Sequence, residues 1–249
     1  MNPVFDLGRL GYFIKRQLNL NLNSLWIAIV SNFGTMLVIS ALFAYFNRQD
    51  EEVLYGLRNM YLVAFSLSGY VFTSMVFKEM NSSKTSYAFL TLPVSKLEKL
   101  VGAWLVSAPV FVVLYGLMIL LLAFFSSMLA QQPEVFPSLF DHNVWVCVKV
   151  YLVTQSIFFL GACTFNGNNF LKTLLALLVF AFIIGLYSTM LGYLLFNSEG
   201  QVVNEQTMNP VLKDNFTFIF TKIIPFIFWY LLAPFMLVVS YFKLQERQV

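Results

Sequence analysis

The stretch VGAWLVSAPVFVVLYGLMILLLAFFSSMLA, residues 101–130, carries no charged side chain. A helix of about 20 apolar residues crosses the roughly 30 Å hydrocarbon core of a membrane, and residues 101–122 alone supply that length. Because an unpaired backbone N–H or C=O is costly in lipid, such a stretch is expected to be helical. Residues 101–122 therefore predict a transmembrane helix.

The composition of the whole chain agrees with this prediction. Of its 249 residues, 59% are hydrophobic and 11% are charged, and the mean hydropathy is +0.75. Soluble domains carry roughly 25% charged residues. The composition therefore indicates a membrane protein.

Five further windows have the length of a span and contain no acidic residue. They are residues 25–46, 60–77, 144–165, 173–196 and 223–242. None shows the alternation of polar and apolar residues that is typical of a membrane β-barrel. The predicted fold class is all-α, a polytopic membrane protein with six transmembrane helices in a single domain, residues 1–249.

The basic residues in the connecting segments predict the orientation, because cytoplasmic loops carry an excess of Lys and Arg. One side holds ten of them: Arg9, Lys15, Arg16, Lys78, Lys84, Lys96, Lys99, Lys172, Lys243 and Arg247. The other side holds four: Arg48, Arg58, Lys213 and Lys222. Both termini are therefore expected in the cytoplasm, with residues 197–222 as an outward loop. The net charge of +3 is then a signal of topology, and we expect no nucleic-acid partner.

Residues 1–24 precede the first span. On a helical wheel Leu7, Leu10, Ile14 and Leu18 fall within an arc of about 80°, opposite Arg9 and Arg16. This pattern predicts a helix lying flat on membrane lipid at the cytoplasmic interface. A solvated basic segment is the alternative.

The cytoplasmic loop at residues 78–99 ends in a helix signal. Ser95 and Glu98 fit the S-x-x-E capping box at the start of the third span, and Pro93 stops any earlier helix. Upstream, residues 87–92 form an apolar run too short to cross a membrane. We expect membrane surface or a partner protein to cover this run.

Residues 90–99 read LTLPVSKLEK and fit the pattern L-x-L-P-x-S-x-x-E-K. With this loop, the flat N-terminal helix and six spans, the chain resembles the permease subunits of type-2 ABC exporters, particularly the short, unfused bacterial kind. The pattern of segments covers nearly the whole chain, whereas only this loop matches residue by residue.

The resemblance implies an inner (cytoplasmic) membrane location, pairing with a second permease copy, and a separate ATP-binding-cassette ATPase subunit that holds ATP and Mg. The loop would be the coupling loop that rests on this ATPase. Its implied contact residues are Lys84, Tyr87, Phe89, Leu90, Leu92 and Lys96. The chain has no G-x-x-x-x-G-K-[ST] motif, so any ATP hydrolysis belongs to another subunit.

Uncharged polar residues lie within the predicted spans. Asn32, Thr35, Ser66 and Thr73 indicate either hydrogen bonds between helices or the wall of a polar pathway. A second set of small residues, Gly185, Ser188, Thr189 and Gly192, permits close approach of another helix. In the resembling family the first and fifth spans meet at the dimer interface, so this set is a candidate dimer face; packing within the chain is the alternative.

Other chemistry has little support in the sequence. The single histidine, His142, stands in an outward loop, so we expect no metal site, no cofactor bound by this chain and no enzymatic activity. The windows contain no Asp, Glu or His, the usual relay residues of secondary transporters, and Lys149 is their only charge. The predicted function is the permease subunit of an ABC exporter. The alternative is a scaffold or assembly subunit without transport activity.

Overall fold

The computed structural model describes residues 5–48, 50–81, 85–196, 214–215 and 217–246, and every element within them is helical. The α-helices are α1 (Leu7–Phe46), α2 (Glu51–Met75), α3 (Lys78–Asn81), α4 (Ser86–Leu90), α5 (Lys96–Leu105), α6 (Phe111–Leu129), α7 (His142–Thr164), α8 (Asn169–Phe196), α10 (Ile224–Phe226) and α11 (Leu232–Glu246). The π-helical turns are η1 (Val106–Val110), η4 (Ile219–Ile223) and η5 (Ile227–Leu231), and the 3₁₀ turns are η2 (Pro133–Val135) and η3 (Pro137–Leu139).

Six helical stretches of the described chain are long and apolar enough to cross a membrane. They are Trp26–Phe46, Glu51–Met80, Lys96–Leu129, His142–Thr164, Asn169–Tyr193 and Ile219–Glu246. Each contains most of one window predicted from the sequence. The all-α class and the six candidate spans are therefore confirmed, and they support a multi-pass membrane protein.

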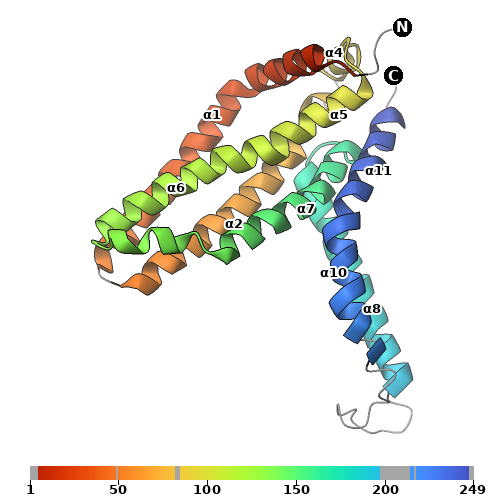
Figure 1. The fold of residues 1–249 in the computed structure, drawn as a ribbon. Helices are drawn as coiled ribbons and strands as arrows, with labels where there is room; N and C mark the ends of the chain where they lie inside the picture. Colours follow the sequence, from red (N-terminus) through yellow and green to blue (C-terminus); the bar gives the residue numbers. More distant parts are fainter. Residues whose placement is uncertain (1–4, 49, 82–84, 197–213, 216, 247–249) are drawn as a thin grey trace.

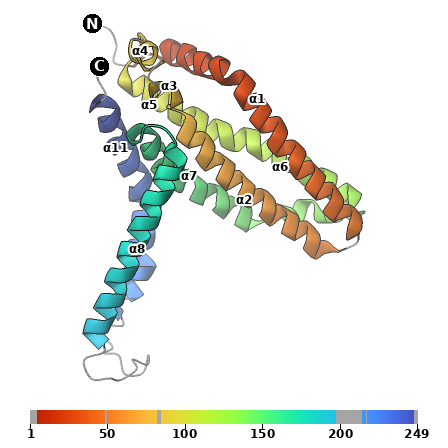
Figure 2. The same ribbon diagram turned by 180° about the vertical axis from the view of Figure 1, so that it is seen from behind.

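Two arms diverge from one end of the molecule (Figures 1 and 2). The first arm contains α1, α2, α6 and the start of α7, and the second contains α8 and the helix that runs from η4 to α11. α7 joins them, since it packs against α2 as well as α8 and α11. α1 begins and α11 ends where the arms meet, beside α4 and the start of α5 (Figure 1). We call this the terminal end.

Some element boundaries differ from the sequence prediction. The N-terminal helix and the first span form one helix, α1, which bends between its two parts (Figure 2). The last span begins earlier than predicted, because Ile219–Ile223 already forms its first π-turn. Residues 197–213 and 216 of the predicted outward loop lie outside the described residues.

Aromatic side chains fill the core of the first arm. Tyr61, Phe65 and Tyr151 are each at most 2% exposed, and Phe65 packs on Tyr151 with ring centroids 4.7 Å apart. The Tyr61 hydroxyl donates to Ser40 Oγ over 2.6 Å, so its polar tip is satisfied inside an apolar environment. The helices of the first arm therefore pack around a closely filled aromatic core.

A π-turn interrupts the third span where it passes α7. Pro109 lies within this turn and has no N–H to donate to a helical hydrogen bond. The Ser107 carbonyl accepts a hydrogen bond from the Tyr151 hydroxyl (3.0 Å), and Ser107 Oγ accepts one from Gln155 Nε2 (2.8 Å). Side chains of α7 therefore satisfy the polar groups of the distorted turn.

An ion pair closes the far end of the first arm. Asp141 caps α7 by accepting from the Asn143 amide, and it lies 2.9 Å from the Arg58 guanidinium of α2. Partial desolvation acts to raise the pKa of Asp141, but Arg58 and the amides of Val144 and Asn143 outweigh it, so the pKa is lowered. α2 begins at Glu51 because Asp50 caps it there, nine residues before the predicted window.

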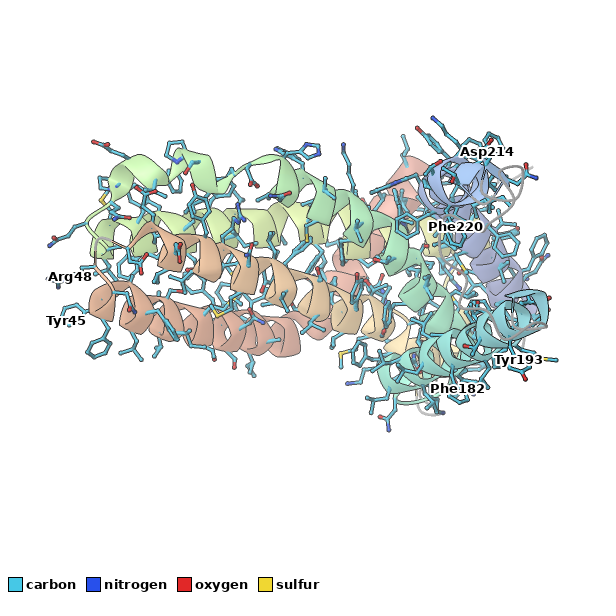
Figure 3. All side chains as sticks on the ribbon, turned by 90° about the horizontal axis from the view of Figure 1, so that it is seen from below. Tyr45, Arg48, Phe182, Tyr193, Asp214 and Phe220 are labelled. Carbon is cyan, nitrogen blue, oxygen red and sulfur yellow. The ribbon has the colours of Figure 1, made fainter. Side chains whose placement is uncertain are left out.

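The second arm buries few of its residues, although α11 packs closely on α7. No residue of α8 between 174 and 193 is buried, and along the last span only Ser240 and Leu244 are. Phe182 and Tyr193 of α8, and Phe220 of η4, project on this arm, far from Tyr45 and Arg48 at the tip of the first arm (Figure 3). These exposed apolar surfaces are available for contact with lipid or with another protein chain.

Candidate functional site at the terminal end

The loop between the second and third spans folds into two short helices, α3 and α4, before α5 begins. Ser95 Oγ accepts from the Glu98 amide (3.2 Å), and Glu98 Oε2 accepts from the Ser95 amide (2.7 Å). These two bonds form the capping box that the S-x-x-E spacing predicts. The cap fixes the residue at which the third span starts.

Glu98 also holds the start of α1. Its side chain is fully buried, and Oε1 accepts from the Asp6 amide (2.7 Å) and from the Arg9 guanidinium (2.9 Å). Charge-assisted hydrogen bonds of this kind are stronger than neutral ones. A single carboxylate therefore joins the beginnings of α1 and α5.

Two more contacts fasten α1 to the end of the second span. The Arg16 guanidinium lies 3.1 Å from Glu79 Oε2 in α3, and Gln17 Nε2 donates to the Val76 carbonyl over 2.8 Å. Val76 caps the C-terminus of α2, so this bond uses one of the carbonyls that a helix end leaves unpaired. α1 is thus bound to both ends of the loop.

Phe13 forms the apolar centre of this contact. It is 2% exposed, and its ring meets Phe89 of α4 edge to face with centroids 6.2 Å apart. A Cβ added at Gly102 of α5 would lie 2.8 Å from Phe13 and 3.1 Å from Leu10. The absence of a side chain at Gly102 is therefore what allows α1 to approach α5 so closely.

Phe89 is buried beside Phe13, whereas the sequence predicted that it would belong to an exposed apolar run. It is 1% exposed, packs on Phe77 as well as Phe13, and its carbonyl accepts from Lys99 Nζ over 2.9 Å. The expectation that lipid or a partner covers the whole run at residues 87–92 is wrong for Phe89, because α1 of the same chain covers it. The implied contact of the loop with an ATPase stays a prediction.

The remaining predicted contact residues have different exposures. Tyr87 is 70% exposed, whereas Leu92 and Lys96 are half-buried. Lys84 and the side chain of Leu90 lie outside the described residues. Tyr87 is therefore the aromatic side chain of α4 that is free to meet another molecule.

A shallow groove of about 320 Å³ lies between α1 and residues 92–94, which lead into α5. Its lining residues are Arg9, Tyr12, Phe13, Arg16, Leu92, Pro93 and Val94. A groove with apolar side chains and two flanking arginines is suited to contact a membrane surface or another protein. The basic side of the groove comes from α1.

The four predicted pathway residues lie at separate positions in the structure. Asn32 and Thr35 line one groove of about 440 Å³ along α1 in the first arm. Ser66 instead donates to the Leu62 carbonyl and lies 3.8 Å from Cys147 of α7, and Thr73 is fully buried. The structure therefore brings the first pair together and separates it from the second.

The candidate dimer face lies on the second arm. Gly185, Ser188 and Thr189 are exposed and Gly192 is half-buried, and the Thr189 hydroxyl donates to the Gly185 carbonyl over 2.8 Å. A hydroxyl bonded within its own helix is satisfied without a partner. The face is accessible, and its use in a dimer stays a prediction.

Sequence reasoning did not predict the partners of Glu98 in α1. Asp6 and Arg9 lie 92 and 89 residues away along the chain, and no local spacing signals such a contact. Among the described residues, no group of three His, Cys, Asp or Glu side chains is placed to hold a metal ion.

Comparison with known protein families, with curated proteins and with solved structures gives no match to this chain.

Proposed function

We propose that this chain is the permease subunit of an ATP-binding-cassette exporter, paired with a second copy and driven by a separate ATPase subunit that binds ATP and Mg. In this proposal both termini are cytoplasmic, α1 begins at the inner surface of the cell's inner membrane, and the terminal end is the side that meets the ATPase. The substrate moves outward as the ATPase subunits close and reopen.

One observation carries this proposal. α4 is a five-residue helix on the connection between two spans, with Phe89 buried in the protein and Tyr87 70% exposed. A short helix anchored on one side and exposing an aromatic ring on the other is suited to dock on a second protein, because aromatic residues are enriched among those that dominate binding energy.

The anchoring of α4 supports a mechanical role. Contacts of α1 with Glu79, Phe89 and Glu98 tie the loop to the first and third spans. A partner that displaces α4 would therefore displace the beginnings of two spans with it. This connection is the physical basis for coupling ATPase movement to the membrane helices.

Co-purification tests the proposal. The chain extracted in mild detergent is expected to bring down a P-loop ATPase, whose activity disappears when that subunit's P-loop lysine is replaced. Tyr87→Ala should weaken this association at least tenfold. Tyr45→Ala is the matched control, because Tyr45 is an exposed tyrosine at the tip of the first arm. Repeated recovery without a nucleotide-binding protein would contradict the proposal.

The second candidate function is a scaffold subunit of a larger membrane complex, and the exposure of the second arm favours it. α8 buries no residue between 174 and 193 against the described chain, which leaves a long helical face for lateral partners. A stable complex with other membrane proteins but without an ATPase would support this candidate instead.

A further inference from the structure

The groove along α1 lies within a candidate span. It is lined by Ala28, Ser31, Asn32, Thr35, Met36 and Ile39 of α1 and by Met60 of α2. Its volume of about 440 Å³ is more than ten times the roughly 30 Å³ that one water molecule takes up in the liquid. The groove therefore has room for part of an organic molecule.

Hydrogen-bond donors in this groove lack partners. The Tyr115 hydroxyl of α6 donates to Asn32 Oδ1 over 3.0 Å and so turns the amide nitrogen away from that bond. Within the described chain, neither Asn32 Nδ2 nor the Ser31 hydroxyl has a hydrogen-bond partner. The Thr35 hydroxyl donates to the Ser31 carbonyl and keeps its oxygen free to accept.

Unpartnered donors at this position need an explanation, because hydrocarbon offers no acceptor and an unsatisfied polar group there is strongly disfavoured. Exposed residues elsewhere on α1 are mainly apolar, as are Ile27, Val30 and Val38. An occupant with oxygen acceptors would satisfy Ser31 and Asn32 together.

The lining also restricts the charge of that occupant. No ionisable side chain lines the groove, and a charge without a partner is strongly disfavoured in a membrane. Met36, Ile39 and Met60 provide an apolar wall, and Met side chains adapt to irregular shapes.

We infer that this groove binds an uncharged amphiphile whose ester, ether or hydroxyl oxygens meet Ser31 and Asn32 while its apolar chain lies on Met36, Ile39 and Met60. The inference rests on the proposed function in naming this molecule as the class of substrate that the exporter moves. A helix of a second copy is the competing occupant, since its polar side chains can also accept from Asn32, and the dimer measurement below distinguishes the two.

Photolabelling of the purified chain in nanodiscs, without the ATPase, tests the site. The probe is a diazirine monoacylglycerol, and a diazirine alkane of equal chain length is the control probe. Adducts of the monoacylglycerol are expected on residues 28–39 and on Met60. Asn32→Leu should reduce them at least fivefold and Ser31→Ala about twofold, with no change for the alkane.

Thr189→Val is the matched control variant, because Thr189 is an exposed threonine on α8 that also donates to its own helix. It should leave labelling unchanged. Equal labelling of the native chain and Asn32→Leu would overturn the inference. So would an Asn32→Leu chain that keeps its adducts but no longer forms dimers, since the groove would then be a helix contact.

A second measurement separates the site from the function. In the complex with its ATPase, monoacylglycerol should raise ATP hydrolysis in the native chain and not in Asn32→Leu, as expected for a transported substrate. Labelling at the groove without any effect on hydrolysis would mean that a bilayer lipid occupies it. That result would overturn the substrate assignment while the ATPase association, tested separately through Tyr87, still stood.

Discussion

At the scale of single residues, Glu98 has two structural roles at the terminal end. Its two oxygens accept from Ser95, Asp6 and Arg9, so it caps α5 and holds α1 at once. Removing this buried carboxylate also takes away the acceptor of the Ser95 and Asp6 amides, and an unsatisfied buried amide costs more than its hydrogen bond contributes.

Replacing Glu98 with Ala should therefore destabilise the protein by about 3 kcal/mol, near the lower bound for breaking a buried ion pair, because Arg9 remains partly exposed. Ser95→Ala removes only a cap and should cost about 1 kcal/mol. Glu246→Ala is the control, since its pair with Lys243 is exposed and should contribute less than about 0.5 kcal/mol. Thermal unfolding in detergent micelles should rank the three variants in this order of lost stability. Equal losses of stability for Glu98→Ala and Glu246→Ala would contradict this account.

Two neighbouring aromatic residues of α4 should respond differently to the same substitution. Phe89→Ala removes a fully buried ring between Phe13 and Phe77 and should cost about 3 to 5 kcal/mol in unfolding free energy. Tyr87→Ala should change stability by less than about 0.5 kcal/mol, as surface substitutions do. Measuring both variants by thermal unfolding checks the direction in which α4 faces; an unstable Tyr87→Ala protein would show that Tyr87 is buried.

At the scale of helices, the sequence predicted those features that depend on neighbouring residues. Apolar length located the six spans, and the spacing of Ser95 and Glu98 located the start of α5. The burial of Phe89 was not predictable, because a five-residue helix has no clear periodicity and its cover comes from Phe13, 76 residues earlier. Likewise, Asn32 and Thr35 share one groove, whereas Thr73 is buried, and both patterns depend on how α1, α2 and α7 pack.

Contact between α1 and α5 depends on Gly102, so Gly102→Ala should loosen the start of α1. The new Cβ would lie 2.8 Å from the buried ring of Phe13, and overpacking of this kind costs about 1 to 3 kcal/mol. Gly116→Ala in α6 is the matched control, because a Cβ there meets open space and improves helix propensity by up to about 1 kcal/mol. Limited proteolysis near residues 5–16 should accelerate only in Gly102→Ala; equal cleavage of both variants would mean that the two helices do not pack this closely.

At the scale of the whole molecule, the two arms differ in how much of their surface they bury. α1, α2, α6 and α7 share one aromatic core, whereas α8 and the last span contact α7 mainly near the terminal end. A single chain of this shape leaves the side of the second arm open. This openness is consistent with a protein that works as part of a larger membrane assembly.

The membrane orientation gives the last prediction. The beginning of α1, the loop helices α3 and α4, and the end of α11 gather at one end of the structure (Figures 1 and 2), and η2 and η3 connect α6 to α7 at the other end of the first arm. The excess of ten basic residues over four predicts that the terminal end lies in the cytoplasm. Single cysteines at Thr85 and Gln245, both exposed, should therefore be shielded from an impermeant thiol reagent in intact cells, while one at Glu134 should react.

The background for these variants has Cys147 and Cys163 replaced by Ala, so that only the introduced thiol is labelled. Permeabilised cells are the control, since all three positions should then react. Labelling of Thr85 and Gln245 but not Glu134 would reverse the orientation and place α4 out of reach of a cytoplasmic ATPase. Labelling of only one of Thr85 and Gln245 would be more serious, because an even number of spans requires them to share a side, and that result would contradict the six-span fold itself.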